Sequence, residues 1–261
     1  MTFVDVETTG LHAAMGDRVC EIALLRVEQE REVARFASLV QPGRPITPGA
    51  AAVNGITDAM LVDAPPFAGL IPHVQALLHN SVFVAHNAPF DLGFLRHEFR
   101  LAGCTLANLP VVDTLALAQA HYRFPHNSLE AIATALEVPS TTRHRAMPDV
   151  LTTHAVLNRF ITDLRRHGPV TLAHLMYPSK HRSATELAAL TMTLQDALRT
   201  GRRLHIRYQA GNAAQTNRVV QPLEMSYERG HSFLRAFCHL RQEERSFRLD
   251  RIVEVDMLTE E

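Results

Sequence analysis

Residues 3–11 read Phe3-Val-Asp-Val-Glu-Thr-Thr-Gly-Leu11. Apolar and polar side chains alternate up to Glu7, which is typical of a strand that buries one face. Asp5 and Glu7 are two positions apart, so a strand presents both carboxylates on the same face. Gly10 follows and favours a tight turn where a ligand can approach the backbone closely. Two like charges on one face favour a bound hard cation, Mg²⁺ or Mn²⁺, because such ions prefer oxygen ligands.

Taken alone, such a pair is more often a solvated strand end, but two further segments favour the metal site. His86-Asn-Ala-Pro-Phe-Asp91 ends an apolar strand and places Asp91 in the first turn of the next helix. His144-Arg-Ala-Met-Pro-Asp149 places His144 in a loop and Asp149 at a helix start. Each acid alone would be explained as a helix cap. With the first pair, they make four carboxylates at strand ends and helix starts, where loops of a mixed α/β sheet converge on a ligand.

The apolar pattern outlines the elements around these segments. Strands are predicted at residues 2–6, 19–27, 36–40 and 81–85. Helices are predicted at residues 67–78, 88–102, 113–121, 128–136 and 148–165. Residues 41–66 hold many of the prolines and are predicted to be loop. Strands first and strand–helix alternation afterwards indicate a mixed α/β sheet with flanking helices.

A second, smaller domain is predicted after the α/β part. Residues 166–185 are rich in proline and glycine and are the expected linker. Residues 186–199 are amphipathic and predict a helix that Gly201 can end. Short strands are predicted at residues 204–208, 216–220, 232–239, 245–249 and 252–257. The expected domains are therefore residues 1–165 and residues 186–261, the latter a helix followed by an all-β unit.

Composition sets limits on the class of protein. The 261 residues allow one large domain or two ordinary ones, and 46% hydrophobic with 20% charged residues is an ordinary globular balance. No apolar run approaches the roughly 20 residues of a membrane span, and no signal peptide is evident. The three cysteines are far apart and form no CxxC pair. This argues against a zinc site or a disulfide framework, and we expect a cytoplasmic protein.

Charge is distributed unevenly along the chain. Residues 1–150 carry 10 basic and 15 acidic residues, whereas residues 199–251 carry 11 arginines and 5 acidic residues. Two modules with different surfaces fit this contrast. Lys180 is the only lysine, however, so the preference for arginine can also reflect genomic composition.

The acidic segments resemble the DEDD exonucleases in their histidine-containing form, the DnaQ-like group that includes the proofreading subunit of bacterial replicative polymerase. The resemblance covers roughly residues 1–165 and includes, besides the three segments above, Asp17-Arg-Val-Cys-Glu-Ile-Ala23 and Val53-Asn-Gly-Ile-Thr-Asp58. Only four residues precede Asp5, so the first strand is truncated or the true start lies upstream. Asn54 stands where many relatives carry histidine, a change that we expect to be tolerated.

This resemblance implies a ribonuclease H-like fold and two divalent metal ions, Mg²⁺ or Mn²⁺, about 3.5–4 Å apart. Asp5 would bridge both ions, Glu7 and Asp149 would complete the site that activates water, and Asp91 would support the second ion. His144 would act as the general base, because imidazole changes charge near neutral pH. The implied reaction is stepwise 3′→5′ hydrolysis that releases nucleoside 5′-monophosphates.

The resemblance also implies which residues contact the substrate. Thr8, Gly10 and Leu11 are expected at the terminal nucleotide, through backbone amides and the leucine side chain. Asn87 and Phe90 are further candidates, although Phe90 can equally belong to the core.

Residues 198–257 resemble a WYL domain, a small Sm-like β-barrel of bacterial regulators and nucleic-acid enzymes. The matching segments are Ile206-Arg-Tyr208, Arg218-Val-Val-Gln-Pro222, residues 234–238 and Phe247-Arg-Leu-Asp-Arg-Ile252. At the tripeptide that names the family, Ser232-Phe233-Leu234 keeps only the leucine. The residues that the resemblance implies as contacts to a nucleic acid or a nucleotide-like ligand are Tyr208, Arg218, Arg235, Arg248 and Arg251. Some of these arginines can instead pair with Glu224, Asp250 or other neighbours.

Several functions remain open at this point. We expect an exonuclease acting on single-stranded DNA in repair or processing, with the barrel as a nucleic-acid grip or ligand sensor. An RNA-trimming exoribonuclease is the second hypothesis, since no residue decides the sugar. The third is an inactive scaffold that regulates by sensing a ligand, which the complete set of acids and His144 argues against. No polymerase-binding segment is evident, and neither the oligomeric state nor the barrel's ligand can be read from the sequence.

Overall fold

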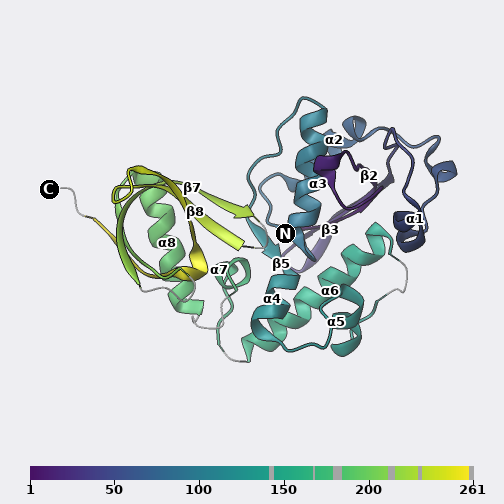
Figure 1. Cartoon of the computed structure of the whole chain (residues 1–261). Helices are drawn as coiled ribbons and strands as arrows, with labels where there is room; N and C mark the ends of the chain where they lie inside the picture. The colour runs from purple at the N-terminus through teal and green to yellow at the C-terminus, as the bar shows by residue number, and fades with distance from the viewer. Residues whose placement is uncertain (141–143, 167, 179–183, 211–214, 229–230, 259–261) are drawn as a thin grey trace. The chain divides into compact units, whose positions relative to one another are not determined.

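The computed structural model describes residues 1–261 except residues 141–143, 167, 179–183, 211–214, 229–230 and 259–261 (Figure 1). The chain forms two compact units, Met1–Asp163 and Leu164–Glu261. Within the described residues, no helix combines the length and the apolar character needed to cross a membrane.

The first unit is built on a five-stranded mixed sheet in the order β3-β2-β1-β4-β5. Its strands are β1 (Thr2–Thr8), β2 (Val19–Glu28), β3 (Arg31–Leu39), β4 (Phe83–Ala85) and β5 (Val111–Asp113). Strands β1, β2 and β3 are antiparallel, whereas β4 runs parallel to both β1 and β5. The mixed sheet predicted from the sequence is confirmed. Its short strand β5 was not predicted, because three apolar residues carry no period of their own.

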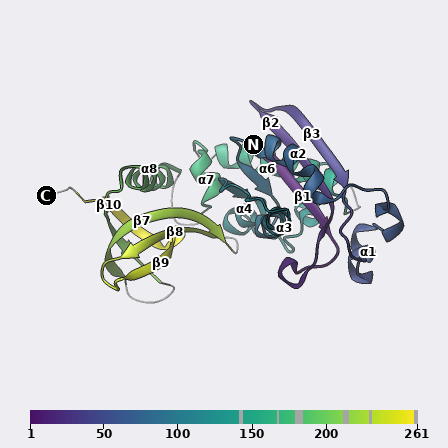
Figure 2. The ribbon, with the colours of Figure 1, turned by 90° about the horizontal axis from the view of Figure 1, so that it is seen from above.

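Six helices of the described chain surround this sheet (Figures 1 and 2). They are α1 (Pro48–Asn54), α2 (Phe67–Leu78), α3 (Ala88–Leu101), α4 (Thr114–His121), α5 (Leu129–Ala135) and α6 (Ala146–Arg165). Helix α2 contacts β2 and α3, and α3 contacts β1, β4 and β5. The phenylalanines Phe3, Phe67, Phe83, Phe99 and Phe160 are among the largest fully buried side chains. This core holds β1 and the start of α3 together, and both carry predicted site residues.

The prediction that residues 41–66 form only a loop is wrong. They contain α1 and the 3₁₀ turn Asp58–Leu61. Thr47 caps α1 by accepting a hydrogen bond from the Ala50 amide, and Pro48 occupies the first turn, where its missing N–H costs nothing. Gly55 ends the helix in the left-handed conformation. The proline that suggested a loop therefore begins a helix.

The second unit packs two helices with a five-stranded antiparallel sheet in the order β10-β6-β7-β8-β9 (Figure 2). Its elements are α7 (Leu172–Met176), α8 (Ala184–Thr200), β6 (Leu204–Tyr208), β7 (Thr216–Glu228), β8 (His231–Cys238), β9 (Glu243–Arg248) and β10 (Ile252–Met257). Helix α7 lies within residues 166–185, where the sequence predicted only a linker. Strand β7 is longer than predicted and continues through Pro222, next to which its pairing with β8 shifts register.

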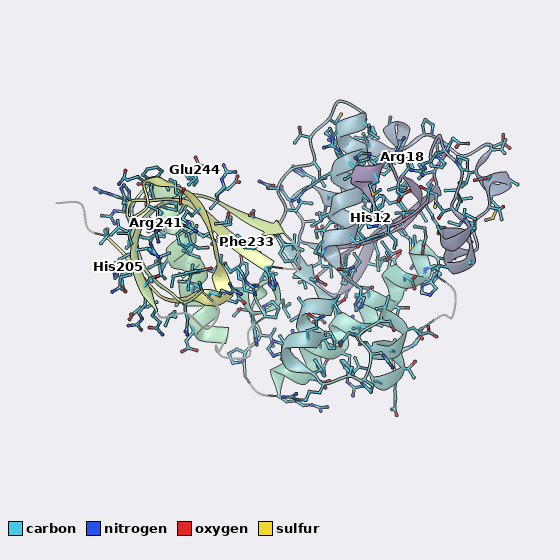
Figure 3. The ribbon with its side chains drawn as sticks, viewed as in Figure 1. His12, Arg18, His205, Phe233, Arg241 and Glu244 are labelled. Atoms are coloured by element: carbon cyan, nitrogen blue, oxygen red, sulfur yellow. The ribbon has the colours of Figure 1, made fainter. Side chains whose placement is uncertain are left out.

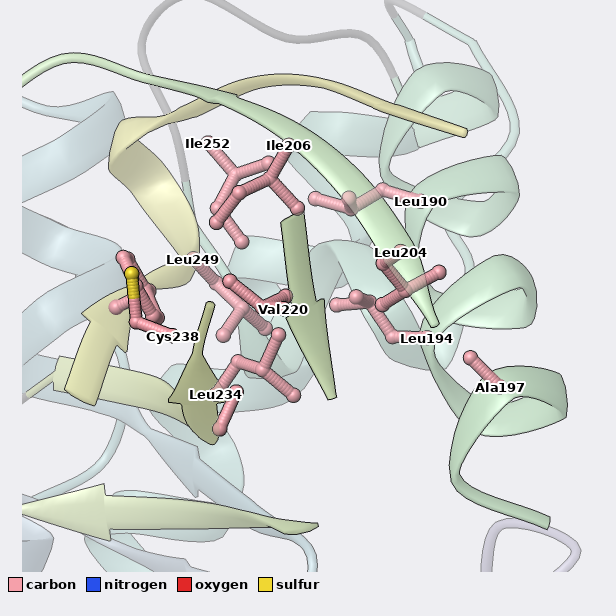
Figure 4. Close-up of a cluster of buried hydrophobic side chains, with 12 residues drawn as sticks. Leu190, Leu194, Ala197, Leu204, Ile206, Val220, Leu234, Cys238, Leu249 and Ile252 are labelled. Carbon is pink, nitrogen blue, oxygen red and sulfur yellow. The ribbon is translucent and has the colours of Figure 1, made fainter. Parts of the chain in front are cut away.

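One apolar cluster forms the core of the second unit (Figure 4). Leu190, Leu194 and Ala197 recur along one side of α8 and are buried against strand residues such as Leu204 and Val220. Tyr177, which follows α7, packs against the same cluster. Helix α8 is therefore part of the fold of this unit, as its amphipathic pattern predicted.

Replacing Leu194 by Ala should destabilise the second unit by about 2–5 kcal/mol, because it leaves a cavity in a fully buried position. Met192 on the same helix is 70% exposed, so Met192→Ala should change stability by less than about 0.5 kcal/mol. Urea denaturation followed by circular dichroism measures both. Equal midpoints for the two variants would contradict the assigned packing of α8.

Candidate active site

Three of the four predicted carboxylates come together in the first unit. Asp5 and Glu7 project from β1, and Asp149 lies in the first turn of α6. One carboxylate oxygen from each of the three lies within 4.8 Å of the other two. The described part of the chain thus contains an all-oxygen cluster of the kind that a hard divalent cation prefers.

Asp91 joins this cluster from the first turn of α3. Its side chain is buried, and its Oδ1 accepts a hydrogen bond of 3.0 Å from the backbone amide of Val6. Val6 lies between Asp5 and Glu7 on β1, so this bond fixes Asp91 beside the strand that carries the other two acids. The negative charge of Asp91 acts directly on Asp5 and raises its pKa.

The electrostatics of the cluster explain why it fits a cation. Burial raises the pKa of Asp5 well above its usual value, and the charges of Asp91 and Glu7 raise it further. Burial and then Asp149 raise the pKa of Glu7 to about 7, and burial raises the pKa of Asp149 to about 6. Each acid is unfavourable as an anion in these surroundings, and a bound divalent ion removes that penalty.

His144 is exposed and lies five residues before Asp149 in the sequence. Its positive form interacts with Asp149 and lowers the pKa of that carboxyl group. The imidazole therefore lies at the solvent side of the cluster. Residues 141–143, in the loop that the sequence predicted before it, lie outside the described residues.

A fifth carboxylate, Glu21 on β2, was not predicted to have a role. Its oxygens accept hydrogen bonds of 2.9 and 2.7 Å from Nε and Nη2 of Arg145, and one of them accepts a third bond, 3.0 Å long, from the Ala146 amide. Glu21 stands within a segment that resembles the family, and Arg145 stands between His144 and Asp149. No property of either residue alone indicates that they pair across 124 positions.

The candidate substrate contacts lie at the end of β1. Thr8 donates from its hydroxyl to the Gly10 carbonyl at 2.6 Å, and Leu11 is 72% exposed. A Cβ at Gly10 would lie 2.6 Å from Cγ of Asp17, so a side chain there would displace the Asp17 carboxylate. Asp17 also accepts a hydrogen bond from the His12 amide and pairs with Arg44. The turn predicted from Gly10 is thus held by a buried carboxylate.

Asn87 and Phe90 occupy the turn that leads into α3. Asn87 adopts the left-handed conformation, and its amide donates to Asp113 at 3.0 Å. Asp113 also caps α4 by accepting from the Leu115 amide. Phe90 is half-buried with its ring 4.9 Å from that of Phe94, so part of its surface belongs to the core.

In the second unit, the candidate ligand residues differ in how they are already engaged. Arg235 pairs with Glu224 at 2.9 Å and reaches Glu244, one of the residues labelled in Figure 3, at 3.7 Å. Arg248 pairs with Asp250 through two hydrogen bonds of 3.0 and 2.6 Å. The expectation that some arginines pair within the barrel thus applies to these two.

The remaining candidates are less engaged. The Tyr208 hydroxyl accepts a hydrogen bond from the Arg248 amide, and its ring meets that of Phe247 edge to face. Arg218 donates from Nε to Thr216, while its Nη1 is buried without a partner in the described structure. No ion pair of Arg251 is found among the described residues.

Residues 2–157 match the family model described as Exonuclease (RNase_T), which covers more than half of the chain. The chain belongs to this exonuclease family. Residues 189–257 match the model of the WYL domain. The resemblances of both parts and the α/β fold class followed by a small β domain are confirmed.

Two curated relatives illustrate the similarity. A DNA polymerase III subunit epsilon-like protein of Rhodobacter capsulatus is 38% identical over 67% of this chain, and the match spans 26% of that protein. The DNA polymerase III subunit epsilon of Treponema pallidum is 32% identical over 72% of this chain and 88% of its own length. The chain therefore spans only about a quarter of the first relative but most of the second.

Two solved structures share the fold. Exonuclease X in complex with 5′ overhanging duplex DNA superposes with a TM-score of 0.52 at 28% identity, over 67% of this chain and 96% of that one. Exonuclease I of E. coli in complex with a dT13 oligonucleotide gives a TM-score of 0.56 at 17% identity, over 90% of this chain and 55% of that one. The second comparison shows the fold alone.

In EDTA, the wild-type chain should lose stability relative to Glu7→Gln as the pH rises from about 5 to about 8. The pKa of Glu7 is about 7 in the folded state against a usual 4.5, so the folded state keeps a proton that the unfolded state has released. This contribution is fully present below pH 4.5 and is lost as the pH rises through about 7. Urea denaturation of both proteins across this range measures it.

Adding Mn²⁺ should stabilise the wild type more at about pH 8 than at about pH 5, because the cation competes with these protons. Parallel stability curves for the wild type and Glu7→Gln in EDTA would contradict the assigned electrostatics.

Proposed function

We propose that this chain is a metal-dependent 3′→5′ exonuclease that hydrolyses single-stranded DNA and releases nucleoside 5′-monophosphates. The observation that carries the proposal is the cluster of Asp5, Glu7 and Asp149, with Asp91 bound to the backbone of the same strand. The domains proposed are residues 1–165 for catalysis and residues 186–261 for binding, joined by residues 166–185. Both family matches lie within these domains.

The four acids are the proposed metal ligands, and their chemistry supports this. All donors are oxygen, all four have a raised pKa, and three already lie within reach of one ion. Two Mg²⁺ or Mn²⁺ ions held by these acids would supply a hydroxide near neutral pH and would neutralise the charge that develops on the phosphate. The charges of Glu7 and Asp91 both act on Asp5, which would suit Asp5 to contact both ions.

His144 is the proposed general base. Its charge acts on the Asp149 carboxyl group, so the imidazole is close enough to the cluster to take a proton from an attacking water. Its exposure allows that proton to pass on to solvent.

The end of β1 is the proposed site of the 3′-terminal nucleotide. Gly10 has no side chain of its own to cover the backbone of this turn, and Leu11 offers an exposed apolar surface next to it. Exonuclease X, which is 28% identical, was solved with DNA, and this similarity favours DNA over RNA for this chain.

The WYL domain is proposed to bind the nucleic acid strand or a nucleotide-like regulatory ligand. Arg218 is the strongest candidate contact, because its buried Nη1 has no partner in the described structure. Arg251 and Tyr208 are the next candidates. Arg235 and Arg248 are placed lower, since carboxylates already neutralise them.

Incubation with Mg²⁺ or Mn²⁺ should shorten 5′-labelled single-stranded DNA stepwise from its 3′ end and do so faster than matched RNA. EDTA or Asp5→Ala should reduce the rate by at least about a thousandfold, since the metal-bound nucleophile is lost. Faster digestion of RNA would assign the exoribonuclease instead. No cleavage of either polymer with either metal would favour the ligand-sensing scaffold.

Replacing Arg218 by Gln should weaken binding of a fluorescent oligo-dT in EDTA roughly tenfold, by loss of about 1.5 kcal/mol from one charged hydrogen bond. The slope of log affinity against log salt should fall by about 0.7. Arg235→Gln is the matched control and should bind nearly as the wild type does, because Glu224 already pairs with this arginine. Fluorescence anisotropy measures both, and equal losses would contradict the ranking of the two arginines.

A further inference from the structure

The register of β1 and β2 places a metal-ligand candidate beside the Glu21 anchor. Glu7 and Glu21 are direct partners in the antiparallel pair, so both side chains stand on the same face of the sheet. Two carboxylates opposite each other repel unless a cation lies between or beside them. Here Arg145 supplies that cation through two parallel hydrogen bonds to Glu21, 2.9 and 2.7 Å long.

The start of α6 brings Arg145 together with a second metal-ligand candidate, Asp149. Arg145 directly precedes α6, and its carbonyl accepts the first helical hydrogen bond, 3.1 Å long, from the Asp149 amide. Arg145 and Asp149 are therefore one helical turn apart. The start of the helix thus meets the sheet through Arg145 on Glu21 and through Asp149 near Glu7.

The electrostatic energies of these two contacts have opposite signs. The carboxylates of Asp149 and Glu7 repel, and the charge of Asp149 raises the pKa of Glu7, whereas Arg145 and Glu21 attract. Among the described residues, no hydrogen bond to the His144 ring is found, and Arg145 follows His144 directly in the chain. Ala146 adds a backbone bond to the same Glu21 oxygen and is itself fully buried.

We propose that the Glu21–Arg145 pair is a positioning device that holds Asp149 against Glu7 and sets the place of His144. This inference rests on the proposed function. The pair touches neither the phosphate nor the reacting water. It acts by fixing the first turn of α6, with bidentate geometry that a lysine ammonium cannot reproduce.

The same unit contains a matched pair that serves as a control. Arg18 donates two hydrogen bonds of 2.8 and 2.7 Å to Glu98, which also accepts from the Val19 amide. Burial is similar, because the Arg side chains are 27% and 35% exposed and the Glu side chains 1% and 9%. Glu98 lies seven residues beyond Asp91 on α3, and among the described residues no hydrogen bond or ion pair joins this pair to α6 or His144.

The decisive experiment compares the double variants Glu21→Gln/Arg145→Met and Glu98→Gln/Arg18→Met, both of which leave the net charge unchanged. Titration calorimetry with Mn²⁺ alone gives the metal affinity, and digestion of single-stranded DNA at saturating Mn²⁺ gives kcat and KM. The first variant should lose about 10- to 100-fold in Mn²⁺ affinity and in kcat with KM nearly unchanged. The second should keep both within about twofold while losing similar thermal stability.

Arg145→Lys provides a milder variant in case the double variant does not fold, and its kcat should lie below that of the wild type. Wild-type Mn²⁺ affinity and kcat in the Glu21→Gln/Arg145→Met protein, or equal losses in the Glu98→Gln/Arg18→Met protein, would overturn the proposal. A wild-type chain that binds Mn²⁺ and cleaves neither DNA nor RNA would overturn the proposed function instead. In that case the Mn²⁺ affinities still decide whether the pair positions Asp149.

Discussion

Repulsion among Asp5, Glu7, Asp91 and Asp149 is the constraint on which the first unit depends. Four carboxylates gather at one end of a buried sheet, and each is disfavoured as an anion there. The packing of the first unit holds the four acids in place despite this repulsion. The acids come from one strand and two helix starts, and the phenylalanine core beneath them holds these elements together. A bound cation would neutralise the carboxylates and relieve this repulsion.

A second set of acids supports this cluster without belonging to it. Glu21, Asp113 and Asp17 each accept hydrogen bonds from backbone amides of a segment that carries site residues. The segments concerned are the start of α6, the turn before α3 and the turn after β1. Such supporting contacts orient metal ligands in many proteins, and the loss of one typically costs about 10- to 100-fold in metal affinity or activity.

The sequence predicted which elements carry the acids, because that placement depends on local structure. Asp5 and Glu7 share a strand face by the two-residue period, and helix starts explain where Asp91 and Asp149 lie. What it could not predict depends on tertiary pairing. The contact between Glu21 and Arg145 joins distant positions, and β5 and α7 are too short for a period to show. In α1, the signal was present but Pro48 was interpreted as a loop residue when it begins a helix.

The bond between Asp91 and the Val6 amide makes the four acids unequal. The ladder between β1 and β4 pairs only Thr2 and Phe3, so the carboxylate of Asp91 takes over where the shorter strand has ended. Removing it leaves a buried amide without an acceptor, which costs free energy in the folded state. An inactive protein for trapping a bound strand is therefore better made at Asp5, whose carboxylate accepts no backbone hydrogen bond within the part of the chain that the structure describes.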